Sequence, residues 1–243
     1  SATATKADAT PYTSGTWTNQ DVTVHYTCAD TGGSGLASCT ADQTFSATTA
    51  TTGGTATDNA GNSAGATFGP INIDKTAPTI SASAKNADNT TYTGGSWTKQ
   101  DVTVHYTCAD TGGSGLANCT ADQVFTATTA STSGTATDNA GNSASATFGP
   151  INIDKTKPTI SATATKADAT PYTSGTWTNQ AITVKFTCAD TGGSGLAGSC
   201  PADQVFSAEG VFTSNAATVS DNAGNMSDPA NNFSVKIDKT PPN

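Results

Sequence analysis

The sequence predicts an all-β chain of three small sandwich domains in tandem, and three observations lead to this prediction. First, the blocks that begin at Cys28, Asp58 and Ile73 each occur three times, at a spacing of about eighty residues. Solenoid repeats have periods of 20–50 residues, whereas a period near eighty is long enough for a domain with its own core. Second, the strongest segment of each repeat alternates apolar and polar residues. Third, no segment shows helical periodicity, and the connections are rich in Gly, Asn, Asp, Ser and Pro.

The segment 21–28 is the clearest predicted strand, because it alternates strictly over eight residues. Its apolar face carries Val22, Val24, Tyr26 and Cys28, and its other face carries Thr23, His25 and Thr27. Weaker strands are expected at residues 1–5, 43–47, 54–58, 66–68 and 71–73. Six or seven short strands in about eighty residues are typical of a β-sandwich. The predicted domains are residues 1–76, 77–156 and 157–243.

Each repeat offers few large apolar side chains for a core. We expect the core to contain the single tryptophan of each repeat, the aromatic residue of the strong strand, and two phenylalanines. These are Trp17, Tyr26, Phe45 and Phe68 in the first repeat, with Trp97 and Tyr106 in the second and Trp177 and Phe186 in the third. A domain of this size is marginally stable on burial alone.

The six cysteines form one pair per repeat, Cys28 with Cys39, Cys108 with Cys119, and Cys188 with Cys200. Short Cys-x-x-Cys spacings of the kind that bind metal are absent. The spacing therefore favours three local disulfides, each worth about 2–3 kcal/mol; free buried thiols are the alternative. Disulfides indicate an extracellular or cell-surface location.

Composition and charge exclude several classes of partner. Charged residues are 12% of the chain, the net charge is −9, and arginine is absent. A nucleic-acid interface concentrates Lys and Arg, and an anionic membrane surface attracts the same residues, so neither partner is expected. The sequence contains neither a signal peptide nor an apolar run long enough for a membrane span. Divalent cations, in contrast, suit an acidic chain.

The repeated motifs resemble those of a known family. Thr-Cys-Ala-Asp with Ser-Gly-Leu-Ala, then Thr-Asp-Asn-Ala-Gly-Asn, then Ile-Asp-Lys-Thr-x-Pro are similar to motifs of bacterial immunoglobulin-like repeats, which occur in tandem in secreted and surface proteins. The resemblance covers nearly the whole chain. It implies Greek-key sandwiches in an elongated array, serving as stalks, spacers or adhesive modules. The third repeat departs from the pattern, with an extra residue before Cys200 and the segments 208–210 and 228–232 altered.

Catalytic residues cannot be assigned, and we expect no enzymatic activity. His25 and His105 lie on the outer face of the strong strand, and Lys185 replaces them in the third repeat. No serine lies in a Gly-x-Ser-x-Gly elbow beside a usable base. Glu209 is the only glutamate, so a glutamate pair of the glycosidase kind is absent. The Gly-Gly-Ser-Gly loop at residues 112–115 lacks the lysine and the helix of a phosphate-binding loop.

The aspartates suggest a metal site. The loop after the strong strand and the hairpin at residues 58–62 should emerge at the same end of each domain, where the preceding linker also arrives. Asp74, Asp110 and Asp138, with Asn139 or Asn142, could thus converge at the first junction, and Asp154, Asp190 and Asp221 at the second. Converging carboxylates suit Ca²⁺, which takes six to eight oxygen ligands. In the alternative interpretation, Asp58 and its equivalents only cap their own turns, and Asp74 is a solvated linker residue.

These observations favour an extracellular structural protein, a stalk or a segment of a surface fibre, filament or sheath. A module that adheres to cell-surface glycans is the alternative; it requires exposed aromatic side chains, so exposure of the three tryptophans would favour it. An accessory region attached to an enzyme is a third interpretation. Ser1 aligns with Ser81 and Ser161, and residues 240–243 resemble the start of another linker. The chain is therefore expected to be part of a longer array or a subunit that contacts copies of itself end to end.

Overall fold

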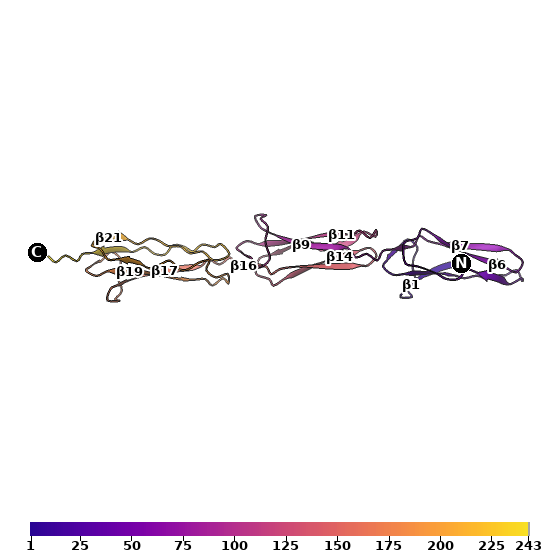
Figure 1. The fold of residues 1–243 in the computed structure, drawn as a ribbon, viewed down its shortest axis with the longest axis horizontal. Helices are drawn as coiled ribbons and strands as arrows, with labels where there is room; N and C mark the ends of the chain where they lie inside the picture. The colour runs from indigo at the N-terminus through magenta and orange to yellow at the C-terminus, as the bar shows by residue number, and fades with distance from the viewer. Residues whose placement is uncertain (243) are drawn as a thin grey trace. The chain divides into compact units, whose positions relative to one another are not determined.

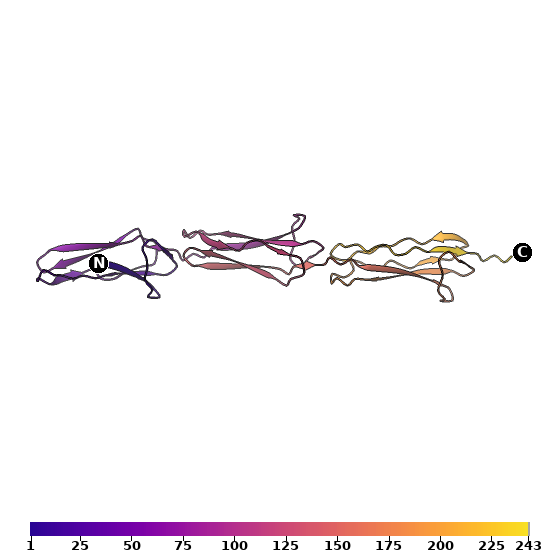
Figure 2. The ribbon, with the colours of Figure 1, turned by 180° about the vertical axis from the view of Figure 1, so that it is seen from behind.

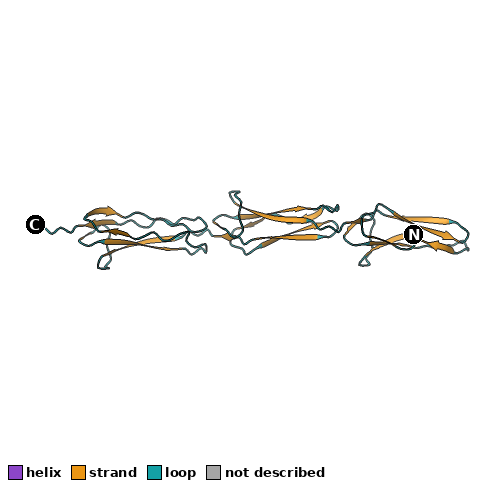
Figure 3. Ribbon diagram, viewed as in Figure 1, coloured by secondary structure: helices purple, strands orange, loops and turns teal. Residues whose placement is uncertain are grey.

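The computed structural model describes residues 1–242, and every regular element among them is a β-strand (Figure 3). The all-β prediction is therefore confirmed. The first repeat contains β1 (Ala2–Lys6), β2 (Trp17–Thr18), β3 (Val22–Tyr26), β4 (Leu36–Cys39), β5 (Gln43–Phe45), β6 (Thr52–Asp58), β7 (Ser63–Phe68) and β8 (Asn72–Ile73). The second contains β9 (Thr79–Asn86), β10 (Trp97–Thr98), β11 (Val102–Ala109), β12 (Leu116–Cys119), β13 (Gln123–Phe125), β14 (Thr132–Asp138), β15 (Ser143–Phe148) and β16 (Asn152–Ile153). The third contains β17 (Thr159–Lys166), β18 (Trp177–Thr178), β19 (Ile182–Ala189), β20 (Gln204–Phe206), β21 (Gly210–Thr213) and β22 (Ser234–Ile237).

The strands lie in two layers within each repeat, as Figures 1 and 2 show from opposite sides. In the first repeat β1, β3 and β5 form one antiparallel sheet, β4, β6 and β7 form the other, and β2 pairs with β8 in parallel. The second repeat has the same three sheets, β13-β11-β9, β12-β14-β15 and β10-β16. The third keeps the first sheet as β17-β19-β20 but builds another from β18, β22 and β21. These sandwich-like units are consistent with tandem immunoglobulin-like domains.

By spatial proximity the chain forms two compact units. One comprises Ser1–Ser83, His105–Asp122 and Ser133–Thr147; the other comprises Ala84–Val104, Gln123–Thr132 and the chain from Phe148 onward. Each unit contains one linker between repeats, the first at residues 74–78 and the second at residues 154–158. Each junction described below therefore lies inside a single unit. The domain boundaries after residues 76 and 156 stay predictions.

The alternating strand positions its side chains as predicted. Val22 and Val24 are fully buried, and Tyr26 is nearly so, while His25 lies on the opposite face beside Asp42. β1 supplies Ala4, which pairs with Val24. The remaining core residues of this repeat are Tyr12, Ile71 and Ile73, with Phe45 and Phe68 packed against them. Apolar burial between two sheets thus follows from period-two patterning.

The tryptophans do not belong to the core, and this part of the prediction was wrong. Tyr12, Tyr92 and Tyr172 are buried instead, each with its hydroxyl donating to a backbone carbonyl. Trp17 and Trp97 are partly buried, and Trp177 is 60% exposed. A buried tyrosine at the β2 end of the sandwich already fills the space between the sheets, so the tryptophans lie outside it.

All three predicted disulfides are present, Cys28–Cys39, Cys108–Cys119 and Cys188–Cys200. The first cysteine of each pair lies at or just after the end of β3, β11 or β19, and the second follows the glycine-rich loop. The loop of residues 29–38 and its equivalents are therefore closed at both ends. This closure holds a loop whose only large apolar residue is Leu36.

The Asp-Asn-Ala-Gly-Asn segments form tight turns, as predicted. In the first repeat the turn joins β6 to β7, and Gly61 has a φ of 90°, which a side chain would disfavour. The turn at residues 221–225 keeps the hydrogen bond from Asp221 N to Asn225 O, but only isolated bridges flank it. The altered third repeat thus retains the turn without the regular hairpin.

A carboxylate after β1 has a strongly lowered pKa and allows a pH prediction. Asp8 accepts hydrogen bonds from the Thr10 hydroxyl at 2.6 Å, from Gln20 Nε2 at 3.0 Å and from Thr10 N at 3.0 Å. These bonds lower its pKa from 3.8 to about 2, the Thr10 hydroxyl contributing most. Because the folded-state pKa is depressed, the stability from this group is fully present above pH 3.8 and is lost as the pH falls towards 2.

We expect carboxyl-carbon NMR titration to give a midpoint near 2 for Asp8, and the same for Asp88 and Asp168, which have equivalent partners. Thr10→Val should raise the midpoint of Asp8 alone, with the other two serving as internal references. An unchanged midpoint in that variant would contradict the assignment of the shift to the hydroxyl.

Candidate metal centres at the junctions between repeats

The linker aspartate Asp74 is held by hydrogen bonds to both its backbone and its carboxylate. It follows β8 directly, and its backbone N–H donates to Thr18 O at 2.9 Å. Its carboxylate accepts from Thr76 N at 2.9 Å through Oδ1 and from Ser114 N at 3.0 Å through Oδ2. The second bond crosses into the glycine-rich loop of the next repeat. Asp74 is only 3% exposed, so the interpretation of Asp74 as a solvated linker residue was wrong.

The glycine-rich loop supplies the second carboxylate. Asp110 accepts from Gly112 N at 3.2 Å and from Gly115 N at 2.8 Å, one bond to each carboxylate oxygen. These bonds curl the loop around the side chain. Gly112 itself has no room for a side chain, because a Cβ there would overlap the carboxylate of Asp74. The glycine therefore allows the linker carboxylate to lie directly against the loop.

The hairpin turn supplies the third carboxylate. Asp138 accepts from Asn142 N at 2.8 Å and from Asn142 Nδ2 at 2.7 Å. The same amide nitrogen donates to Asp74 O at 2.9 Å and therefore holds the linker backbone. Asn139, the other asparagine considered from sequence, bonds instead to Ser114 O within its own repeat. Asp138 thus caps its turn, as the alternative interpretation holds, and also faces the junction.

These three carboxylates come together as the sequence predicted. One oxygen of each of Asp74, Asp110 and Asp138 lies within 4.8 Å of the others, and the same holds for Asp154, Asp190 and Asp221. Two oxygens bound to one Ca²⁺ at 2.3–2.6 Å cannot be more than about 5 Å apart. Both clusters therefore satisfy the spacing that a shared cation demands.

The second junction repeats the first with one closer contact. Asp154 accepts from Ser194 N at 3.0 Å and from the Ser194 hydroxyl at 2.6 Å. Asn225 Nδ2 donates to Asp154 O at 2.9 Å, as Asn142 does to Asp74. Burial raises the pKa of Asp154, but the hydrogen bonds from Ser194 and Thr156 outweigh it, so this pKa lies below its usual value. The carboxylate is therefore ionised at neutral pH.

At the first junction the Ser114 hydroxyl lies beside the Asp74 carboxylate. Ser114 is 8% exposed, and its Oγ makes no hydrogen bond of acceptable geometry in this rotamer. The hydroxyl nevertheless contributes most to lowering the pKa of Asp74, ahead of the Thr76 and Ser114 N–H groups. The equivalent Ser194 hydroxyl donates to Asp154 at 2.6 Å, so the Asp74 carboxylate is the natural partner of Ser114.

The electrostatics of the clusters favour a cation. Two like charges 4.8 Å apart repel by about 3 kcal/mol at an effective dielectric constant of 20. No lysine offsets this repulsion: the ion pairs found among residues 1–242 use Asp21, Asp42, Asp101, Asp122 and Asp228. A divalent ion would remove most of the repulsion in each cluster.

Two tryptophans pack at the junctions, a position that the sequence did not predict. A Cβ added to Gly113 would lie 3.8 Å from Trp17 Cη2, and one added to Gly193 would lie 3.8 Å from Trp97 Cη2. Each indole thus lies against the glycine-rich loop of the following repeat. The only signal in the sequence is the recurrence of the tryptophan three residues before Gln20 and its equivalents.

Comparison with models of known protein families gave no match for this chain, and comparison with curated proteins gave none either. Among the described residues there is no helix long and apolar enough to cross a membrane.

Proposed function

We propose that the protein is an extracellular structural repeat protein, a stalk or a segment of a surface fibre, whose junctions between repeats are stiffened by bound Ca²⁺. The observation that supports this proposal is the burial of the linker aspartate in the next repeat. A flexible tether would leave Asp74 and Asp154 in solvent, yet they are 3% and 2% exposed. Three disulfides support an oxidising compartment. The motif resemblance supports a relation to bacterial immunoglobulin-like repeats.

Calcium would be held by residues that already fit it. Asp74, Asp110 and Asp138 would bind the ion at the first junction, with Ser114 beside them, and Asp154, Asp190 and Asp221 at the second. When bound, the ion would link the linker, the loop and the hairpin, which come from two repeats, and so resist bending. Mg²⁺ demands near-ideal octahedral geometry and suits such a loop-built site less well.

We expect isothermal titration of the metal-free chain with CaCl₂, in dilute protein, to reveal two sites. Asp110→Asn should leave one site, because the remaining two carboxylates supply too little charge. Asp30→Asn is the matched control: Asp30 makes the same bonds to its loop, from Gly32 N and Gly35 N, but no linker carboxylate lies beside it. Dissociation constants of about 0.1–1 mM are typical of extracellular modules.

Two sites in both variants, or no binding below about 1 mM, would contradict the calcium proposal. Small-angle scattering with and without EGTA then tests stiffening. Chelation should broaden the distribution of interatomic distances. If calcium binds without changing the scattering, the mechanical role fails although the metal site stands.

An adhesive module that binds cell-surface glycans is the second candidate, and one observation favours it. Trp177 is 60% exposed, with Lys236 Nζ 5.9 Å from its ring centre, so it offers a stacking surface. Trp17 and Trp97, however, lie against the following repeat. A repeated sugar platform is therefore not supported.

A further inference from the structure

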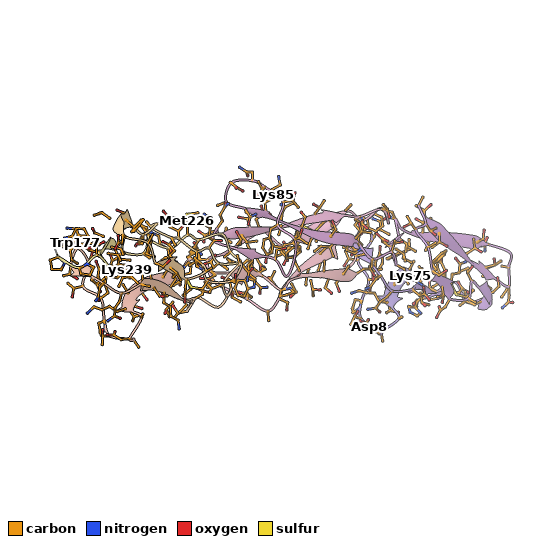
Figure 4. The ribbon with its side chains drawn as sticks, turned by 60° about the vertical axis from the view of Figure 1, so that its left-hand side comes forward. Asp8, Lys75, Lys85, Trp177, Met226 and Lys239 are labelled. Atoms are coloured by element: carbon orange, nitrogen blue, oxygen red, sulfur yellow. A yellow bond between two sulfur atoms is a disulfide. The ribbon has the colours of Figure 1, made fainter. Side chains whose placement is uncertain are left out.

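The two junctions share most of their contacts, and this shared set does not distinguish them. In both, the linker carboxylate accepts at 3.0 Å from a serine N–H of the next repeat, Ser114 at the first junction and Ser194 at the second. In both, an asparagine of the hairpin turn donates to the carbonyl of the linker aspartate at 2.9 Å. The linker lysine of each junction pairs with an aspartate of the preceding repeat, and Figure 4 shows the first of these lysines, Lys75, beside the first repeat.

Lys99 gives the second junction a bond of its own. It directly follows β10, and its Nζ donates to Gly224 O at 2.8 Å. Gly224 belongs to the hairpin turn of residues 221–225, so this bond joins the second repeat to the third. A hydrogen bond from an ammonium group is stronger than one between neutral groups. Because the acceptor is a backbone carbonyl, the bond forms without any ion in the carboxylate cluster.

Asn19 occupies the equivalent position at the first junction and has a shorter side chain. Its Nδ2 lies 4.0 Å from the place that a Cβ on Gly141 would take, so it faces the equivalent turn. Among residues 1–242, however, the Asn19 side chain has no hydrogen-bond partner. The first junction therefore lacks the bond that Lys99 makes.

Two smaller differences also make the second junction the tighter one. Asn225, which holds the linker carbonyl there, is 8% exposed, whereas its equivalent Asn142 is partly exposed. Lys157, at the position of Ala77, pairs with Asp228 of the third repeat at 2.9 Å. The side chains of this pair are 62% and 87% exposed, so the pair alone contributes little.

We propose that Lys99 holds the second junction closed without a bound ion, so that the first junction alone is the hinge that calcium controls. The calcium control of this hinge rests on the proposed function, whereas the role of Lys99 does not. When the ion is removed, repulsion among the carboxylates favours opening at both junctions. Only at the second does a charge-assisted bond between the repeats oppose it. The chain then has one flexible junction in the absence of calcium instead of two.

Amide hydrogen exchange at Ser114 and Ser194 compares the two junctions directly. Both N–H groups donate to a linker carboxylate, and both lie in identical local sequence, so their intrinsic exchange rates are equal. Both amides should be protected in CaCl₂. In EGTA, Ser114 should exchange roughly five- to tenfold faster than Ser194, which is the difference expected from one hydrogen bond.

Two substitutions should exchange the properties of the junctions. In EGTA, Lys99→Asn should bring the exchange rate of Ser194 up to that of Ser114. Asn19→Lys should slow Ser114 to the rate of Ser194, because a lysine at this position can reach the turn of the second repeat. Each variant receives the residue that the equivalent repeat already carries, so both should fold.

Lys85→Asn is the matched control for the loss of charge. Figure 4 shows Lys85 on a turn that projects from the second repeat, the repeat that also carries Lys99. Its side chain is exposed and has no ion-pair or hydrogen-bond partner within residues 1–242. Exchange at Ser114 and Ser194 should be the same in this variant as in the wild type.

Equal exchange of the two serine amides in EGTA, or an unchanged Ser194 amide in Lys99→Asn, would overturn the inference. The calcium titration separates this failure from that of the proposed function. Two calcium sites with equal exchange in EGTA would remove the role of Lys99 and leave the stalk proposal intact. A slower Ser194 amide that depends on Lys99, with no effect of calcium on either amide, would keep the role of Lys99 and remove calcium from the hinge.

Discussion

Gly112→Ala should open the first junction while leaving both adjoining repeats folded. A Cβ at this position would overlap both oxygens of the Asp74 carboxylate. The linker must then move, and the bond from Ser114 N to Asp74 Oδ2 is lost with it. Overpacking of this kind costs about 1–3 kcal/mol. The cost falls on a contact between repeats, so the sheets of each repeat should keep their stability.

Amide hydrogen exchange reports this opening directly. Exchange at Ser114 should accelerate by roughly ten- to a hundredfold, in line with a local cost of about 1–3 kcal/mol. Val102 and Val104, which are fully buried in β11, should exchange as in the wild type. Calcium titration of the variant should show a single site, because the linker carboxylate has left the cluster.

The chain contains its own control for this substitution. Gly32 occupies the same position in the first repeat, and Gly32→Ala meets only its own loop. Gly32→Ala should therefore leave amide hydrogen exchange in its own glycine-rich loop unchanged. If Gly112→Ala and Gly32→Ala accelerated exchange equally, the conformation of the loop, and not the linker carboxylate, would explain why glycine is needed at position 112.

Local sequence was sufficient to predict the features that arise within one repeat. The alternation of residues 22–26 determines which face of β3 is buried, and this pattern does not depend on neighbouring domains. The short spacing of Cys28 and Cys39 pointed to a local disulfide. The convergence of Asp74 with Asp110 and Asp138 could be predicted because strand direction fixes which loops share an end of a sandwich.

Features that depend on contacts between two repeats could not be predicted from the local sequence. Trp17 seemed to be a core residue because large aromatic side chains are usually buried, but a tyrosine fills that space and the indole covers the next repeat. The carbonyl of Asp74 as the partner of Asn142 likewise depends on where the linker lies. The sequence places Gly112 in a loop, but only the position of the Asp74 carboxylate in the structure shows why a side chain is excluded there.

Gly54→Ala should destabilise the first repeat more than any other glycine substitution in β6. Gly54 lies under the ring of Tyr26, and a Cβ would come within 2.5 Å of Cδ1 and 2.7 Å of Cε1. The ring cannot move away freely, since Tyr26 packs with Val22 and Val24 in the core. A cost of about 2–3 kcal/mol is expected, at the upper end for overpacking. That corresponds to a melting temperature lower by roughly 10–20 °C for a domain of this size.

The adjacent glycine provides the control. A Cβ on Gly53 would be 3.7 Å from its nearest neighbours, and the second repeat has Ser133 at this position. Gly53→Ser should therefore change the melting temperature little. Hydrogen exchange in β3, with β11 of the second repeat as internal reference, assigns the loss of stability to the first repeat. Equal effects of the two substitutions would show that backbone flexibility of β6, rather than the space beneath Tyr26, determines the need for glycine. A large effect of Gly54→Ala alone would establish that the strand approaches the aromatic ring closely enough to exclude every side chain.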